Sequence, residues 1–240
     1  MSSSLPAAPA PFTRWLVPDR VLLAAQLALF ESTGLDLLVQ DRFFDFSTGR
    51  WLVDAQEPVG RLVFYTGPKA VIIAAGVALL VLLAGPARWR ERRRLDRRGR
   101  AVAFLTLATV PALAGWGKST TNVFCPSEIR RYGGEVPFVK LCAPYPADDR
   151  PERRGHCFPA GHASGGFALL GLAWVRGSRR WGRGALALGL GAGWWMGGYQ
   201  MLKGAHYLSH TVTTMLVAGI IALAWRQVIR PRPGAAEAAR

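Results

Sequence analysis

Six long apolar segments constrain the fold of this chain more than any other feature. A helix needs roughly 17–25 mostly apolar residues to cross the hydrocarbon core of a bilayer. Half of the 240 residues are hydrophobic, nine are Trp, and the mean hydropathy is +0.17, which is more apolar than an ordinary soluble domain. We therefore predict membrane-spanning helices over residues 16–39, 67–87, 101–117, 160–175, 184–199 and 208–225.

The placement of the arginines predicts how these helices are oriented. Eight Arg lie in 88–100, four in 176–183 and four more from residue 226 onward, all in alternate connections. By the positive-inside rule these segments face the cytoplasm, and 40–66 and 118–158 face outward. The net charge of +15 is thus explained by topology and gives no reason to expect nucleic acid as a partner. The predicted fold is an all-α, integral membrane bundle of six transmembrane helices with both termini in the cytoplasm.

The same pattern predicts one membrane domain between two short ends. Residues 1–14 lack a basic segment followed by an apolar core, so they are interpreted as a disordered lead and not as a cleavable signal. Residues 15–228 form the membrane domain, and 229–240 form a flexible basic tail. The aromatic segment 41–61 is interpreted as an interfacial helix or lid, or as a plain membrane-surface anchor.

All four histidines lie on the predicted outer side. Around His162, Pro159 suits the first turn of a helix, and Gly161 allows the backbone to approach a ligand closely. The free N–H groups of such a helix start attract anions. The alternative is that His162 only caps this helix or contacts lipid headgroups.

A second polar group lies in the stretch GGYQMLKGAHYLSH, residues 197–210. At about 100° per residue, a helix would bring Lys203, His206 and His210 into one narrow arc, with Gln200 at its edge. A polar face at an otherwise apolar helix end is more often functional than structural. The alternatives are an interfacial helix end with a snorkelling lysine, and a metal or haem site on the two histidines.

A third polar group follows the third predicted span. The stretch GKSTTNVFCPSEIRRYGG contains Lys118, Arg130 and Arg131, which are donors suited to phosphate. The alternative is a solvated loop. Three such groups on one membrane face favour an anion site.

Three cysteines lie in or beside the outer segment 118–158, where an oxidising compartment permits a disulfide. We favour Cys125–Cys157 because these two residues flank the polar groups. Three free thiols remain the alternative.

The three polar groups together resemble the integral membrane branch of the type 2 phosphatidic acid phosphatase family. Its pattern is K-x6-R-P, then P-S-G-H, then S-R-x5-H-x3-D. The corresponding stretches here begin at Lys118, Pro159 and Tyr199, in the same order and with the same spacing, across roughly residues 100–225. Four positions depart from the pattern, namely Cys125, Ala160, Gln200 and His210, which stand for Arg, Ser, Arg and Asp.

The resemblance implies roles for these residues. His206 would attack phosphorus and form a phosphohistidine, and His162 would protonate the leaving alkoxide as general acid. Lys118 and the Gly161 N–H would hold the phosphoryl oxygens, without metal or cofactor. From spacing, we expect Lys203 with Arg130 or Arg131 to replace the missing guanidiniums, and neutral His210 to accept a hydrogen bond from His206. The predicted phosphate-binding set is Lys118, Gly161, Lys203, Gln200, Arg130 and Arg131, and the predicted catalytic set is His206, His162 and His210.

The resulting expectation is a metal-independent phosphatase of the bacterial inner membrane with its active site facing the periplasm. Its substrate would be a phosphorylated lipid of the lipid A, undecaprenyl pyrophosphate or phosphatidyl phosphate type. A lipid-to-lipid phosphotransferase and a non-catalytic protein that binds or transports lipid phosphates are the alternatives.

Overall fold

The computed structural model of the chain describes residues 17–86, 96–176 and 178–229. The predicted N-terminal lead, residues 1–14, lies outside the described residues. So does the predicted basic tail, apart from Ile229. Apart from one two-stranded hairpin and an isolated bridge between Ile129 and Val136, the regular secondary structure of the described part is helical, which agrees with the predicted all-α class.

Long helices are joined mostly by short turns, but residues 133–160 form a long segment without helix. Local sequence accounts for where two of them start, since Glu57 caps the turn that begins at Pro58, and Asp96 accepts hydrogen bonds from Arg98 N and Gly99 N at 3.2 and 3.0 Å. The elements are α1 (Val17–Ser32), α2 (Leu35–Gln40), β1 (Phe44–Asp45), β2 (Arg50–Trp51), α3 (Pro58–Arg61), the π-helical turn η2 (Leu62–Thr66), α4 (Gly67–Ala84), α6 (Arg97–Thr120), the 3₁₀ turns η3 (Pro126–Glu128) and η4 (Arg130–Tyr132), α7 (Gly161–Ala168), the 3₁₀ segment η5 (Leu169–Trp174), α8 (Arg179–Leu202) and α9 (Leu208–Val228).

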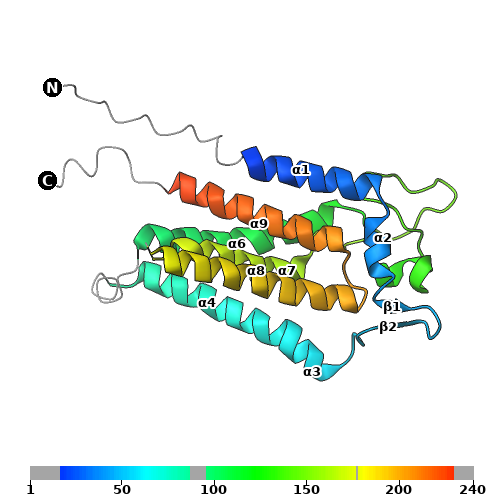
Figure 1. Cartoon of the computed structure of the whole chain (residues 1–240), viewed down its shortest axis with the longest axis horizontal. Helices are drawn as coiled ribbons and strands as arrows, with labels where there is room; N and C mark the ends of the chain where they lie inside the picture. Colours follow the sequence, from blue (N-terminus) through cyan, green and yellow to red (C-terminus); the bar gives the residue numbers. More distant parts are fainter. Residues whose placement is uncertain (1–16, 87–95, 177, 230–240) are drawn as a thin grey trace.

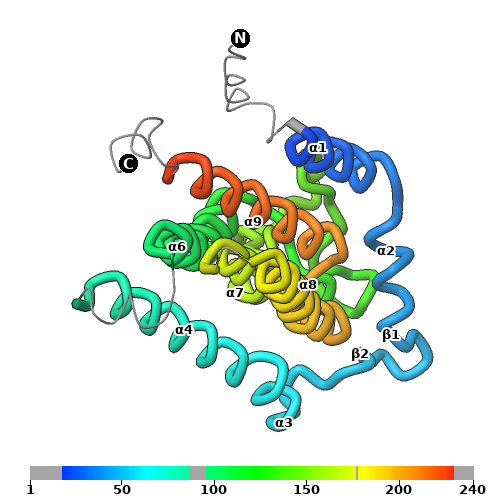
Figure 2. The backbone as a smooth tube through the Cα atoms, turned by 60° about the vertical axis from the view of Figure 1, so that its left-hand side comes forward, coloured from blue at the N-terminus to red at the C-terminus, as the bar shows by residue number. Residues whose placement is uncertain are grey.

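The long helices run side by side in one bundle (Figure 1). Helices α6, α7, α8 and α9 gather at its centre, and α1 and α4 lie on opposite outer sides, α1 against α9 and α4 against α6 (Figure 2). Helix α6 begins and α9 ends at the left of Figure 1, whereas the α8–α9 turn, α2 and the hairpin lie at the right. The bundle therefore has two distinct ends.

Three helical segments of the described residues are long and apolar enough to cross a membrane. They are Pro58–Ala84, Arg97–Thr120 and Leu208–Val228, and they indicate a membrane-associated protein. The other predicted spans correspond to α1, to α7 with η5, and to α8, which do not meet the same length and hydropathy criteria. The count of six spans and the side on which the termini lie therefore stay predictions.

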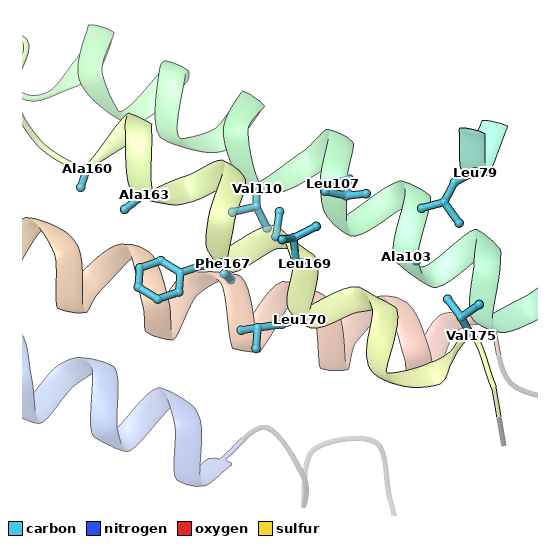
Figure 3. Close-up of a cluster of buried hydrophobic side chains, with 12 residues drawn as sticks. Leu79, Ala103, Leu107, Val110, Ala160, Ala163, Phe167, Leu169, Leu170 and Val175 are labelled. Atoms are coloured by element: carbon cyan, nitrogen blue, oxygen red, sulfur yellow. The ribbon is translucent and has the colours of Figure 1, made fainter. Parts of the chain in front are cut away.

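The core of the bundle forms where α4, α6, α7 and η5 meet (Figure 3). Phe167, Ala163 and Ala103 are fully buried there, and Leu107 and Leu79 pack beside them. Small residues bring the central helices close, since a Cβ on Gly166 of α7 would lie 2.5 Å from the backbone N of Gly193 in α8. The glycine-rich helix α8 therefore packs tightly against α7.

The segment between α2 and α3 differs from the predicted interfacial helix. It forms the short β1–β2 hairpin, with Phe44 paired to Trp51. Both aromatic rings pack against Tyr132 of η4, at centroid distances of 5.2 and 5.0 Å. This aromatic contact joins parts of the chain that are distant in sequence, so the local sequence does not reveal it. It favours a hairpin over a helix here.

Candidate active site

The start of α7 brings Gly161 and His162 next to the end of α6. Ala160 N donates a hydrogen bond to Thr214 Oγ1 of α9 at 3.0 Å, which ties this turn to the neighbouring helix. Lys118 lies directly over Gly161, because a Cβ built on Gly161 would be 2.9 Å from Lys118 Cε. The ammonium of Lys118 donates to the carbonyl of His156 at 3.3 Å. The lysine is thus held above the first N–H groups of α7.

His206 and His210 are adjacent, but not as members of one helix. Helix α8 ends at Leu202 and α9 begins at Leu208, with Gly204 at φ +72° between them. The prediction of one continuous helical arc is therefore wrong. Trp51 covers Gly204 so closely that a Cβ would collide with the indole, which explains the need for glycine in this left-handed turn.

The turn places the two imidazoles in contact. His206 Nδ1 lies 3.4 Å from His210 Nδ1, and both rings are about 2% exposed. If His206 Nδ1 carries the proton and donates it to His210, the Nε2 of His206 keeps a free lone pair. Burial, followed by the positive charge of Lys118, holds the pKa of His206 well below the usual 6.5. The ring of His206 is therefore neutral at pH 7 and able to act as a nucleophile.

His162 faces the same pair from α7. Its ring centroid lies 5.9 Å from that of His206, and the ring of Tyr65 meets it edge-on at 4.7 Å. The Nδ1 atom of His162 is buried and has no hydrogen-bond partner among the described residues. The three predicted catalytic histidines thus form one cluster, although they come from two separate parts of the chain.

A disulfide links the segment beside this cluster to the start of η3. Cys125 and Cys157, the favoured pair, are bonded, with their Cα atoms 5.2 Å apart, and Cys142 is free and exposed. Cys157 Sγ lies 3.5 Å from His206 Nδ1. Potential metal-ligand atoms of Cys157, His206 and His210 all lie within 4.8 Å of one another, but a sulfur in a disulfide is not a thiolate ligand. The described residues therefore offer two imidazoles there and no complete tetrahedral set.

Two of the predicted replacement cations form ion pairs with carboxylates. Arg130 forms a bidentate pair with Asp149, and Arg131 forms one with Asp41 at the end of α2. These pairs hold the pKa values of both carboxyls below their usual range through hydrogen bonding to the guanidinium. The two arginines are therefore engaged with carboxylates in this structure, and the role of one of them at the histidines stays a prediction.

Lys203 and Gln200 lie at the end of α8. The ammonium of Lys203 stacks over the ring of Tyr199 at 5.1 Å, and burial lowers its pKa. Gln200 is 1% exposed, and neither polar atom of its amide has a partner among the described residues. A buried amide without partners is costly, so these atoms are available to a ligand.

An apolar cavity of about 580 Å³ leads away from this polar group between α4, α6 and α7. Sequence reasoning missed two of its residues, Tyr65 and Lys69 of the η2–α4 segment. The signal was a lysine inside an otherwise apolar span, which is rare without a function. The cavity lining consists of Tyr65, Lys69, Ile72, Ile73, Gly76, Phe104, Leu107, Ala108, Pro111, Lys118, Gly161, His162, Ser164, Gly165 and Met196.

Asp36 of α2 is a second residue that sequence reasoning left without a role. Its carboxylate accepts hydrogen bonds from Ser209 N at 2.9 Å and Ser209 Oγ at 2.5 Å, in the first turn of α9. A carboxylate at a helix start satisfies free N–H groups and complements the helix dipole. Asp36 thus fixes the start of the helix that carries His210, and both residues line the same small cavity.

One comparison with known proteins identifies the family of this chain. No curated protein and no solved structure matches the chain. The sequence model of the PAP2 superfamily matches residues 99–233, more than half of the chain, and this range includes Lys118 and all the histidines. Membership supports a phosphatase activity on phosphate esters, often those of lipids. The chain, with its histidine cluster at one end of a helical bundle, belongs to the PAP2 superfamily.

Proposed function

We propose that this protein is a membrane phosphatase that removes phosphate from a lipid phosphate monoester or pyrophosphate. The observation that carries the proposal is the apolar cavity with a cationic end beside the histidine cluster. A water-soluble phosphate ester would need no such cavity. An amphiphile fits it with its headgroup at the histidines and its chain along the helices.

The dimensions of the cavity support a lipid chain. Its α6 lining runs from Phe104 to Lys118, which is about 20 Å at a rise of 1.5 Å per residue. Its polar residues collect at one end, where Lys69, Lys118 and His162 lie, and Phe104 with the other apolar side chains lines the remainder. This distribution matches a phosphorylated head followed by an acyl or prenyl chain.

The proposed reaction has two steps, formation of a phosphohistidine and its hydrolysis. The Nε2 lone pair of His206 attacks phosphorus, the bond from phosphorus to the lipid oxygen breaks, and protonated His162 donates its proton to the departing alkoxide. Water then attacks the phosphohistidine, His162 takes the proton from that water, and inorganic phosphate leaves with Nε2 restored. His210 holds the proton on His206 Nδ1 in place through the 3.4 Å contact.

Fixed donors stabilise the charge on the three transferring oxygens. Lys118 and the Gly161 N–H lie beside each other and supply a cation and a backbone donor. Lys203 and the unpartnered amide of Gln200 are proposed to replace the arginines of the family pattern. Since these groups supply the positive charge, the reaction as written requires no metal.

We further propose that the histidine end faces the periplasm of a bacterial inner membrane, with six spans and cytoplasmic termini. Two observations support this orientation. The disulfide lies at the histidine end, and an oxidising compartment is where such bonds persist. Arginines of the connections collect at the opposite end, as the positive-inside rule requires of a cytoplasmic face.

The test uses the purified full chain in detergent with a panel of lipid phosphates and pyrophosphates, with and without chelator. We expect phosphate release that survives chelator and is abolished in His206→Ala. Base-quenched wild-type protein should carry phosphate on His206 by mass spectrometry. Products with phosphate on a second lipid would instead identify a phosphotransferase, and no turnover of any lipid would favour a binding protein.

A second variant separates the two histidine roles. In His162→Gln, hydrolysis of alkyl phosphates should collapse, because an alkoxide needs a proton to leave. A burst of product from 4-nitrophenyl phosphate should persist, because nitrophenolate leaves unprotonated. Loss of both activities to the same extent would contradict the assignment of His162 as general acid.

A further inference from the structure

A second large cavity lies at the end of the bundle opposite the histidines. It has a volume of about 840 Å³ and is lined by the start of α6, the end of η5, the start of α8 and the end of α9. From Arg98 in this cavity to Lys118 at the histidine end, α6 rises about 30 Å, which equals the thickness of the hydrocarbon core. The cavity is therefore one membrane thickness away from the proposed active site.

Five guanidiniums line this cavity. They come from parts of the chain far apart in sequence, and the ion pairs found within the described ranges use other residues. The carboxylate among the lining residues, Asp96, accepts hydrogen bonds from the backbone at the start of α6. The five are Arg98, Arg176, Arg179, Arg183 and Arg226.

The helix junction beneath the cavity is closely packed, and the five arginines extend from it as exposed side chains. Arg226 stacks over the ring of Trp174 at 5.3 Å, and Asp96 N donates to Val175 O at 3.1 Å. Gly99 faces the carbonyl of Trp174 so closely that a Cβ would collide with it. The end of η5 is therefore held against the start of α6. These contacts fix the backbone from which the arginines extend.

Apart from Asp96 and Ser178, the remaining lining carries no polar side chain, and it continues onto exposed apolar residues of α8. Val102 and Leu186 lie in the cavity, and Leu186 is followed on α8 by Leu188 and Leu190, which are 55% and 40% exposed. A soluble anion would not need this apolar continuation. A lipid with an anionic head and acyl chains matches both parts.

We propose that this cavity, which we call the arginine pocket, binds the phosphodiester headgroup of an anionic membrane lipid in the leaflet opposite the active site. Guanidiniums match phosphate oxygens in bidentate geometry, and basic pockets between membrane helices at this depth take anionic headgroups. The lipid stabilises the junction of α6, η5, α8 and α9 and is not the substrate. This proposal does not depend on the proposed phosphatase function.

The test measures lipid binding by the full chain and does not require activity. Native mass spectrometry of the protein in detergent compares phosphatidylglycerol with phosphatidylcholine. We expect at least about tenfold tighter binding of phosphatidylglycerol. We expect the triple variant Arg179→Gln/Arg183→Gln/Arg226→Gln to lose this preference. The matched control Arg42→Gln/Arg50→Gln/Arg150→Gln removes the same charge from the exposed surface at the histidine end and should keep it.

Each other outcome overturns the proposal. If the wild-type protein binds the two lipids equally, the proposal that the arginine pocket selects an anionic headgroup is refuted without any variant. An equal loss of preference in the control triple would mean general attraction to a basic protein. Displacement of phosphatidylglycerol by inorganic phosphate would identify a soluble-anion site. If the pocket triple does not fold, the single variant Arg183→Gln, checked by its thermal unfolding, must weaken phosphatidylglycerol binding selectively.

Discussion

Gly161→Ala perturbs the proposed site by a single methyl group. The new Cβ would lie 2.9 Å from Lys118 Cε and 3.8 Å from its Nζ. The obstructing atoms belong to a flexible side chain, so the lysine swings away while the backbone stays. The N–H of residue 161 is kept, and alanine is a better helix former than glycine, so α7 should form normally.

The size of the effect follows from what the lysine does. A hydrogen bond from an ammonium to phosphate contributes about 1.5–3 kcal/mol. Its loss in the transition state therefore lowers kcat/KM by about 10- to 150-fold. The free energy of unfolding should change by less than about 1 kcal/mol, because no buried contact of the backbone is lost.

The assay is steady-state hydrolysis of the lipid phosphate that the wild-type protein turns over best. Gly191→Ala is the control, because nothing lies within 4 Å of a Cβ at that position of α8. A double-mutant cycle with Lys118→Met tests the route of the effect. If Gly161→Ala acts by displacing the lysine, adding it to Lys118→Met costs nothing further.

Two results would refute this reasoning. Wild-type kcat/KM in Gly161→Ala would mean that the methyl group does not move the lysine or that Lys118 does not contact phosphate. Full additivity of the two substitutions would mean that they act independently.

Four further predictions concern residues around the same site. Lys203→Ala should lower kcat/KM by about tenfold or more while leaving the unfolding midpoint nearly unchanged. Wild-type kinetics in this variant would show that Lys203 does not bind phosphate. Asp36→Asn should lower the free energy of unfolding by about 1–2 kcal/mol in denaturant titrations, because the start of α9 loses its charged cap; an unchanged value would contradict that role. Reducing Cys125–Cys157, which closes a loop of sequence separation 32, should cost about 4 kcal/mol by the chain-entropy relation, and no change on reduction would contradict a structural bond. Stability should also fall as pH drops below 6.5, by up to about 1.4 kcal/mol per unit from His206, because the unfolded histidine takes up a proton that the buried one does not. The slope should flatten in His206→Gln.

The sequence predicted the helical segments well because apolar length is a local property. Five of the six predicted spans fall on long helices or helical segments, and the first is divided by a break between Ser32 and Leu35. Segment 41–61 was interpreted as an interfacial helix or lid, or as a plain membrane-surface anchor. It forms the β1–β2 hairpin followed by the short α3, so one helix over the segment is wrong, whereas the lid and the anchor stay predictions. Its hairpin depends on Tyr132, some eighty positions further along the chain, and no local pattern reports such a partner.

Motif spacing by itself determined which histidines belong together and which cysteines to favour as a pair. The tertiary structure decided how they meet, since a turn at Gly204 and not a continuous helix brings His206 to His210. It also decided which cations are paired with carboxylates. Arg131 forms an ion pair with Asp41 from another segment, whereas Lys118 lies over Gly161. Both cavities exist only where several helices converge. Pairing of charges and the space between helices depend on contacts between residues distant in sequence, which a pattern along the chain does not encode.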